Sequence, residues 1–166
     1  MIILGCDPGT VQSALVWYDS EKELILDKQL VSNRDVVQHI KDQKFAPRVF
    51  AIEYIKSYGM SVGQTTFDTC IWCGIFDEAF RATMHENSFI VYVPRKAVCK
   101  NLCNNGNAKD PNISRALKDR LGEPGRKASP GKTYDIKKDL WSALAVAVTC
   151  SDLWGGNNNF SMFTSE

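Results

Sequence analysis

The chain opens with Met1-Ile-Ile-Leu-Gly-Cys-Asp7-Pro-Gly-Thr10, an apolar run that stops at a carboxylate. Its near-continuous apolar character predicts a strand over residues 2–6 that is covered on both faces of a sheet. Pro8-Gly9 directly behind Asp7 predicts a turn. A charge beside a core is costly unless it is paired or bound to a metal. Asp7 is therefore either a simple turn-forming residue or a side chain held at a strand end for chemistry.

The composition is that of one ordinary globular domain. The chain has 166 residues, of which 44% are hydrophobic and 23% are charged, enough to bury a genuine core. No apolar run approaches the roughly 20 residues of a membrane helix, and no signal peptide is expected ahead of the first strand. We expect a soluble, cytoplasmic protein with one domain over residues 1–154 and a polar C-terminal tail over residues 155–166.

The charges are segregated along the chain although the net charge is only +1. Residues 94–138 hold twelve Lys or Arg and four Asp or Glu, a local balance of +8, which leaves the remainder at −7. Such asymmetry predicts a polyanion-binding face on an acidic body, with nucleic acid as the favoured partner. The alternative is a solvated basic loop without a partner.

Periodicity and turn residues predict an alternation of strands and helices. We expect strands at residues 2–6, 13–18, 24–31, 48–53 and 89–93. We expect helices at residues 33–44, 64–84, 95–102, 112–121 and 136–151, with a loop at 122–134. Hairpins give antiparallel pairs and helical crossovers give parallel pairs, so this order predicts an α/β fold with a five-stranded mixed sheet flanked by helices.

The helix expected at residues 64–84 carries two sets of apolar side chains. One side is predicted to hold most of the set Phe67, Ile71, Gly74, Ile75 and Phe80. The aromatic and aliphatic residues Phe67, Ile71, Trp72 and Phe76 are available either as core or as a dimer interface, and the sequence leaves this open.

Six cysteines raise the possibility of a zinc site. Cys70-x-x-Cys73 and Cys99-x-x-x-Cys103 could together supply four thiolates. However, Cys70 and Cys73 fall within a predicted helix, and free cysteine is among the most buried residue types. We favour reduced structural thiols, with zinc as the alternative.

Two predicted strands end on acidic residues, Asp7 and Glu53. If these strands are parallel neighbours, the two carboxylates lie close together and attract a divalent cation. The last helix offers a third acid at Asp139, or at Asp135 one turn earlier. The alternatives are a helix cap for Asp135 and a solvated first-turn acid for Asp139.

Three motifs carry a resemblance to a known family. The strand ending in Asp7-Pro-Gly-Thr10, the strand ending in Ile52-Glu53, and Asp139-x-x-Ser142-Ala-Leu-Ala-Val-Ala together resemble the RuvC-type Holliday-junction resolvases. The resemblance covers roughly residues 2–151 and is closest to bacteriophage members. It implies an RNase H-like fold, a homodimer, and Mg²⁺-dependent cleavage of four-way DNA junctions in recombination or phage DNA processing.

The resemblance also implies roles for individual residues. By position, Asp7, Glu53 and Asp139 match the catalytic, metal-binding acids, which would hold two Mg²⁺ ions, with Mn²⁺ expected to substitute. The family usually places a further acid three residues after Asp139, where this chain has Ser142. A hydroxyl is a poorer Mg²⁺ ligand than a carboxylate. Asp135 or Asp110 could compensate, and the sequence does not decide between them.

The DNA contacts are predicted from the basic section and from the loop after Glu53. The basic section should border the carboxylate edge, and its candidates for phosphate contact are Lys96, Lys100, Lys109, Arg126, Lys127 and Lys132. In the loop, Tyr58 could stack on unpaired bases and Lys56 could add charge. Tyr58 could equally pack on its own helix.

Three other functions fit parts of the sequence. A nuclease of the same fold could prefer flaps or forks, and Ser142 could mark a weakened protein that binds junctions without cutting them. Actin-like ATPases also begin with a strand ending in an Asp-x-Gly-Thr turn. They need a second subdomain, for which 166 residues leave no room, so we expect no nucleotide cofactor.

Overall fold

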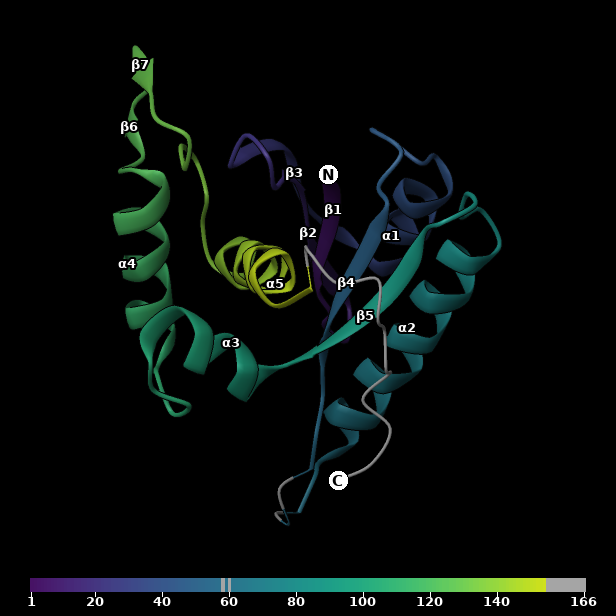
Figure 1. The fold of residues 1–166 in the computed structure, drawn as a ribbon. Coiled ribbons are helices and arrows are strands. Elements are labelled where there is room, and N and C mark those ends of the chain that lie inside the picture. The colour runs from purple at the N-terminus through teal and green to yellow at the C-terminus, as the bar shows by residue number, and fades with distance from the viewer. Residues whose placement is uncertain (58, 60, 155–166) are drawn as a thin grey trace.

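The computed structural model describes residues 1–57, 59 and 61–154, with the backbone alone at residue 154. It shows an α/β fold with a five-stranded mixed sheet of order β3-β2-β1-β4-β5, flanked by helices (Figure 1). The predicted fold class is therefore confirmed. Tyr58 and the tail at residues 155–166 lie outside the described residues.

The elements follow the predicted order. The strands of the sheet are β1 (Ile2–Asp7), β2 (Gln12–Asp19), β3 (Leu24–Ser32), β4 (Val49–Tyr54) and β5 (Phe89–Pro94). The helices are α1 (Asn33–Lys41), α2 (Gln64–Arg81), α3 (Arg95–Cys103), α4 (Asp110–Leu121) and α5 (Asp139–Trp154). The segment expected to be a loop contains a small hairpin of β6 (Gly125–Arg126) and β7 (Ser129–Pro130). Within the described residues, no helix is both long enough and apolar enough to cross a bilayer.

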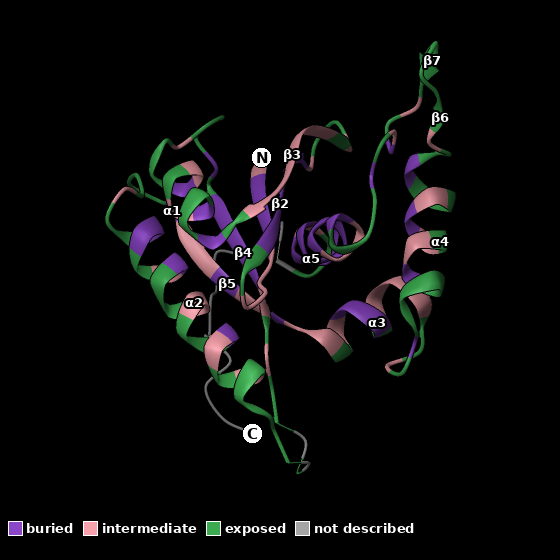
Figure 2. Ribbon diagram, turned by 180° about the vertical axis from the view of Figure 1, so that it is seen from behind, coloured by how far each residue is buried: buried purple, intermediate pink, exposed green. Residues whose placement is uncertain are grey.

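β1 lies at the centre of the sheet, as its apolar run predicts. It pairs antiparallel with β2 and parallel with β4, and β4 pairs parallel with β5. Its residues Ile3, Leu4, Gly5 and Cys6 are buried. One core cluster joins one face of the sheet to α3, α4 and α5, and a second joins the other face to α1 and α2 (Figures 1 and 2).

α5 packs closely on β1 at Gly5. A Cβ on Gly5 would lie 2.3 Å from the Ala143 carbonyl oxygen and 2.8 Å from the Ala147 Cβ. Only glycine therefore permits α5 to approach this closely. Asp139 is one turn before Ala143, so this packing also fixes the start of α5 relative to β1.

The structure shows which apolar side chains of α2 meet the sheet, a point that the sequence left open. Phe76, Ala79 and Phe80 are buried, with Trp72 and Cys73 beside them. Of the set predicted to lie mostly on one side, Phe80 is buried, whereas Phe67 at 54%, Ile71 at 61% and Ile75 at 39% are exposed. Both faces of this helix are apolar, so periodicity could not show which one meets the sheet.

The two cysteine pairs lie on opposite faces of the sheet. Cys73 on α2 belongs with the cluster under α1 and α2, whereas Cys99 and Cys103 on α3 belong with the cluster under α5. All six cysteines are free thiols. The sheet between the pairs prevents four thiolates from meeting, so the zinc alternative is wrong.

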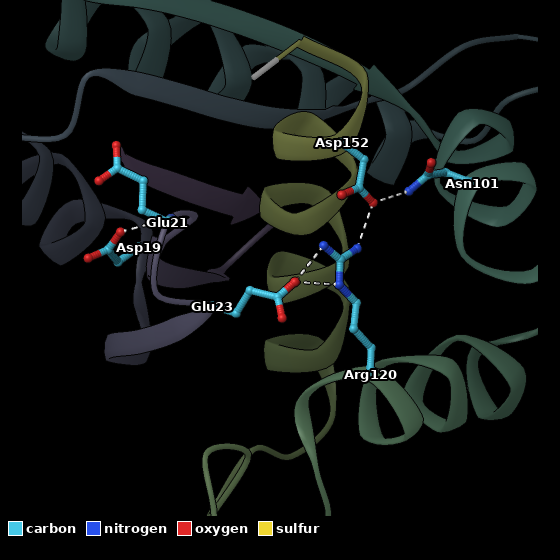
Figure 3. A network of polar contacts seen from close by, with 6 residues as sticks. All are labelled: Asp19, Glu21, Glu23, Asn101, Arg120 and Asp152. Atoms are coloured by element: carbon cyan, nitrogen blue, oxygen red, sulfur yellow. Dashed lines mark hydrogen bonds and ion pairs between the residues drawn. The ribbon is translucent and has the colours of Figure 1, made fainter. Parts of the chain in front are cut away.

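The C-terminal end of α4 is held against the rest of the domain by Arg120 (Figure 3). Its guanidinium donates to Glu23 in the β2–β3 turn at 2.7 and 2.9 Å and to Asp152 on α5 at 2.7 Å. The Asn101 amide of α3 donates to the same Asp152 carboxylate at 2.8 Å. This network joins α3, α4 and α5 to one another and to the sheet.

Candidate active site

Asp7 and Glu53 lie side by side at one edge of the sheet. The parallel register pairs Cys6 with Ile52, so the next residue on each strand is one of the two acids. The Asp7 carboxyl group donates a hydrogen bond to the Glu53 carboxylate. The expected meeting of these two strand ends is therefore confirmed.

The turn behind Asp7 is fixed by a small buried network. The Gly9 amide donates to the Ser13 hydroxyl at 3.0 Å, and this hydroxyl donates to the Asn33 side-chain oxygen at 2.6 Å. The Asn33 amide group donates back to the Gly9 carbonyl at 2.9 Å. A Cβ on Gly9 would lie 2.3 Å from the Gln12 carbonyl oxygen, so this tight turn requires glycine. The network holds Asp7 in place and was not foreseen from the sequence.

The two carboxyl groups are electrostatically strained. Burial is the largest cause that raises the pKa of Asp7, to about 8, and the charge of Glu53 and the hydrogen bond to it add to this effect. Burial also raises the pKa of Glu53, against the opposing charge of Arg95. The pair therefore holds a proton near neutral pH.

Asp139 approaches the pair from α5. It is the exposed first residue of the helix, and its negative charge is a further cause that raises the pKa of Asp7. Asp139 and Ser142 line a pocket of about 350 Å³ together with residues of α4. The structure thus brings Asp7, Glu53 and Asp139 to one region, with Ser142 beside Asp139.

Arg95 is a residue of this region that the sequence reasoning missed. It is the first residue of α3, directly after β5, and its guanidinium lies 3.9 Å from the Glu53 carboxylate. A second nitrogen of the same group is ion-paired with Asp110. A usable signal existed, because β5 is parallel to β4 and so delivers the residue after it to the same edge.

Asp135 does not take the place expected for it. α5 begins at Asp139 and not near residue 136, and Asp135 lies before it in a left-handed conformation with φ of 59°. Its exposed carboxylate pairs with Lys137 at 2.6 Å, and this contact lowers its pKa. Asp135 is therefore neither the cap of α5 nor part of the carboxylate group.

The donor set fits a divalent cation in its chemistry. Two partly buried carboxyl groups that share a proton, with a third acid nearby, are the oxygen ligands that Mg²⁺ prefers. In the part of the chain that the structure describes, no three His, Cys, Asp or Glu side chains are close enough to enclose a metal ion. Metal binding would require Asp7 to release the proton that its raised pKa favours.

The basic residues expected to contact DNA fall into two groups. The first group is Lys96, Lys100 and Lys109, all of which are exposed. Lys96 follows Arg95, Lys109 precedes Asp110, and Lys100 lies one turn after Lys96 on α3. The exposed residues Arg126, Lys127 and Lys132 lie in and beside the β6–β7 hairpin, beyond the other end of α4 (Figure 1). A 12-residue helix is about 18 Å long. The expectation that the whole section borders the carboxylates is therefore wrong for the hairpin group.

The raised pKa of Asp7 predicts how the stability of the metal-free protein depends on pH. The folded state keeps a proton that the unfolded state releases above the ordinary pKa of 3.8. The free energy of unfolding should therefore fall as pH rises from about 4 to 8. Asp7→Asn removes this ionisation, so the variant should gain stability over wild type at pH 8 but not at pH 4.

The measurement is urea unfolding of both proteins in EDTA at the two pH values. Asp119→Asn, an exposed acid on α4, is the control that should follow wild type. An equal stability difference between Asp7→Asn and wild type at both pH values would contradict the assignment.

Solved structures with this fold include two of RuvC from Thermus thermophilus. One, a RuvC structure, aligns with a TM-score of 0.68 and 18% sequence identity, over 91% of this chain and 93% of that chain. The other, RuvC in complex with a Holliday junction substrate, aligns with a TM-score of 0.69 and 17% identity over the same shares. No protein-family model and no curated protein sequence matches the chain. The chain therefore has a RuvC-type, RNase H-like fold.

Proposed function

We propose that this protein is a metal-dependent, structure-selective DNA endonuclease that resolves four-way junctions. The observation that carries the proposal is the meeting of Asp7 and Glu53 on adjacent parallel strands, with Asp139 beside them. The fold is that of RuvC, one of whose structures is a complex with a Holliday junction substrate. Such an enzyme would act in the cytoplasm of a bacterial host on recombining or phage DNA.

The three acids have distinct tasks in this proposal. Asp7 and Glu53 form the rigid part of the site, because their strands and the turn after Asp7 fix them. Asp139 adds an exposed carboxylate from α5. Two Mg²⁺ ions, or Mn²⁺ in their place, would supply activation of the attacking water and stabilisation of the leaving oxygen. Before such binding, Asp7 must release its proton.

The two basic groups would hold different parts of the DNA. Lys96, Lys100 and Lys109, with Lys56 in the loop after β4, are exposed on the elements that reach the carboxylate edge. Arg126, Lys127 and Lys132 lie about one helix length away from this group. They would therefore contact DNA phosphates in a different stretch of the DNA backbone. Tyr58 stays a proposed stacking residue of the loop.

We also propose that the protein works as a homodimer, because two symmetric nicks need two sites. The exposed side chains Phe67, Ile71 and Ile75 recur every four residues along α2 and form an apolar stripe. A second copy of α2 would cover this stripe. Trp72 and Phe76, the other candidates for this interface, pack toward the sheet instead.

Ser142 favours a second candidate function, that of a protein that binds junctions but cuts them poorly or not at all. Its hydroxyl lies on the same pocket as Asp139, where a carboxylate would bind a cation more strongly. Preference for flaps or forks would keep the site and change only the substrate.

Cleavage of a synthetic four-way junction tests the proposed function. Wild type with Mg²⁺ or Mn²⁺ should place paired symmetric nicks in the junction while leaving matched duplex intact. Asp7→Asn and Glu53→Gln should each lower the single-turnover rate about 10³-fold, because each removes several kcal/mol of stabilisation, while junction binding in EDTA survives. Asp119→Asn should cut like wild type.

Other outcomes of this experiment separate the candidates. Junction binding by wild type without cutting under either metal would support the weakened binding protein. Faster cutting of a flap than of the junction would replace the substrate, and full activity of Asp7→Asn would remove the site assignment.

The salt dependence of binding tests the division of the basic residues. Replacing Arg126, Lys127 and Lys132 together with alanine should weaken junction binding and lower the log–log salt slope by about 0.9 for each phosphate that these side chains neutralise. The cleavage rate at saturating protein should stay unchanged, because these residues are remote from the acids. An unchanged slope, or a lower saturated rate at normal affinity, would contradict this division.

A further inference from the structure

The wall of the pocket that α5 forms carries only one carboxylate, that of Asp139. Asp139 and Ser142 stand three residues apart on one helix, and the second offers only a hydroxyl. A hydroxyl carries no charge to offset that of a divalent cation, and Lys138, which lines the same wall, adds a positive charge beside Asp139. This wall therefore supplies only one carboxylate and needs a further acid to bind a divalent cation.

The opposite wall of the same pocket supplies another acid. The first turn of α4 lines it with Asp110, Pro111, Ile113 and Ser114. The Asp110 side chain is 80% exposed, so it can turn into the pocket at little cost in packing. Its backbone is fixed, because Ile113 is buried and the far end of α4 is held by its arginine network (Figure 3).

Arg95 connects Asp110 to the pair of buried acids. Its guanidinium is shared between the Asp110 carboxylate, with which it is ion-paired, and the Glu53 carboxylate at 3.9 Å. The negative charge of Asp110 is itself one of the causes that raise the pKa of Glu53. Asp110 thus belongs to the same electrostatic group as Asp7, Glu53 and Asp139, although it comes from another helix.

We propose that Asp110 supplies the carboxylate that is missing at Ser142, and that Arg95 holds it beside Glu53 until a divalent cation takes over the neutralising charge. This inference rests on the proposed function and assigns one more cation-binding residue to that site. Arg95 acts as a positioning residue, because it touches the acids and not the cation.

A purely structural role for Asp110 makes different predictions. An acid in the first turn of a helix is stabilised by the helix dipole, and an exposed ion pair adds at most about 1 kcal/mol. Loss of Asp110 would then lower stability slightly and leave cation binding unchanged. Ser142→Asp would then change cation affinity by the same factor whether residue 110 is Asp or Asn.

The test measures bound Mn²⁺ directly, by electron paramagnetic resonance of free Mn²⁺ titrated with protein in the absence of DNA. Asp110→Asn should weaken binding of one ion about tenfold, whereas Asp119→Asn on the same helix should bind like wild type. Adding Ser142→Asp to Asp110→Asn should restore the affinity. Arg95→Gln should raise the affinity of the otherwise unchanged protein, because the competing cation is gone.

The outcomes separate this inference from the function on which it rests. Wild-type affinity in Asp110→Asn, or no recovery in the double variant, would overturn the role of Asp110 while Asp7→Asn still tests the main site. Loss of Mn²⁺ binding in Asp110→Asn, with recovery when Ser142→Asp is added, would establish the role of Asp110 as a cation ligand. A folding defect caused by Asp110→Asn would not be corrected by a substitution on α5. If wild type binds no Mn²⁺ at all, both proposals fall.

Discussion

Two carboxyl groups that end adjacent parallel strands cannot both ionise at a partly buried edge without a positive charge beside them. In this protein Asp7 and Glu53 meet this constraint by sharing a proton and by the nearby guanidinium of Arg95. A divalent cation would meet it more fully. The rest of the structure keeps these two groups together: the sheet register sets their separation, and the Gly9, Ser13 and Asn33 network stops the turn behind Asp7 from relaxing.

The helices on one face of the sheet bring further charges to the same edge. Gly5 lets α5 lie directly on β1, which places Asp139 near Asp7. α3 begins at this edge because it follows β5, and α4 begins beside the pocket that α5 lines. One edge of the sheet therefore receives charged residues from two strands and three helices, while the basic hairpin is carried to the other end of α4.

The sequence predicted what depends on periodicity and chain order. Alternating strands and helices predicted the sheet, and Asp7 and Glu53 followed from two strands that stop at acids. The sequence could not predict features that depend on tertiary contacts, such as the buried face of a helix or the partners of a charged side chain. The apolar pattern of α2 fits either face. The apolar residue Ile136 suggested a helix start that the left-handed backbone at Lys138 delays to Asp139. The parallel strands could have placed Arg95 at this edge, but its role could not be distinguished from a phosphate contact until its partners Glu53 and Asp110 were located.

The position of bound metal would show whether Asp7 and Glu53 form the metal site of this protein. An anomalous difference map from crystals grown with Mn²⁺ and a four-way junction carrying non-hydrolysable linkages would show this position. We expect a peak between the carboxylates of Asp7 and Glu53, with a DNA phosphate beside it. A map with the junction bound but without a peak there, or with the metal at some other group of side chains, would contradict this assignment.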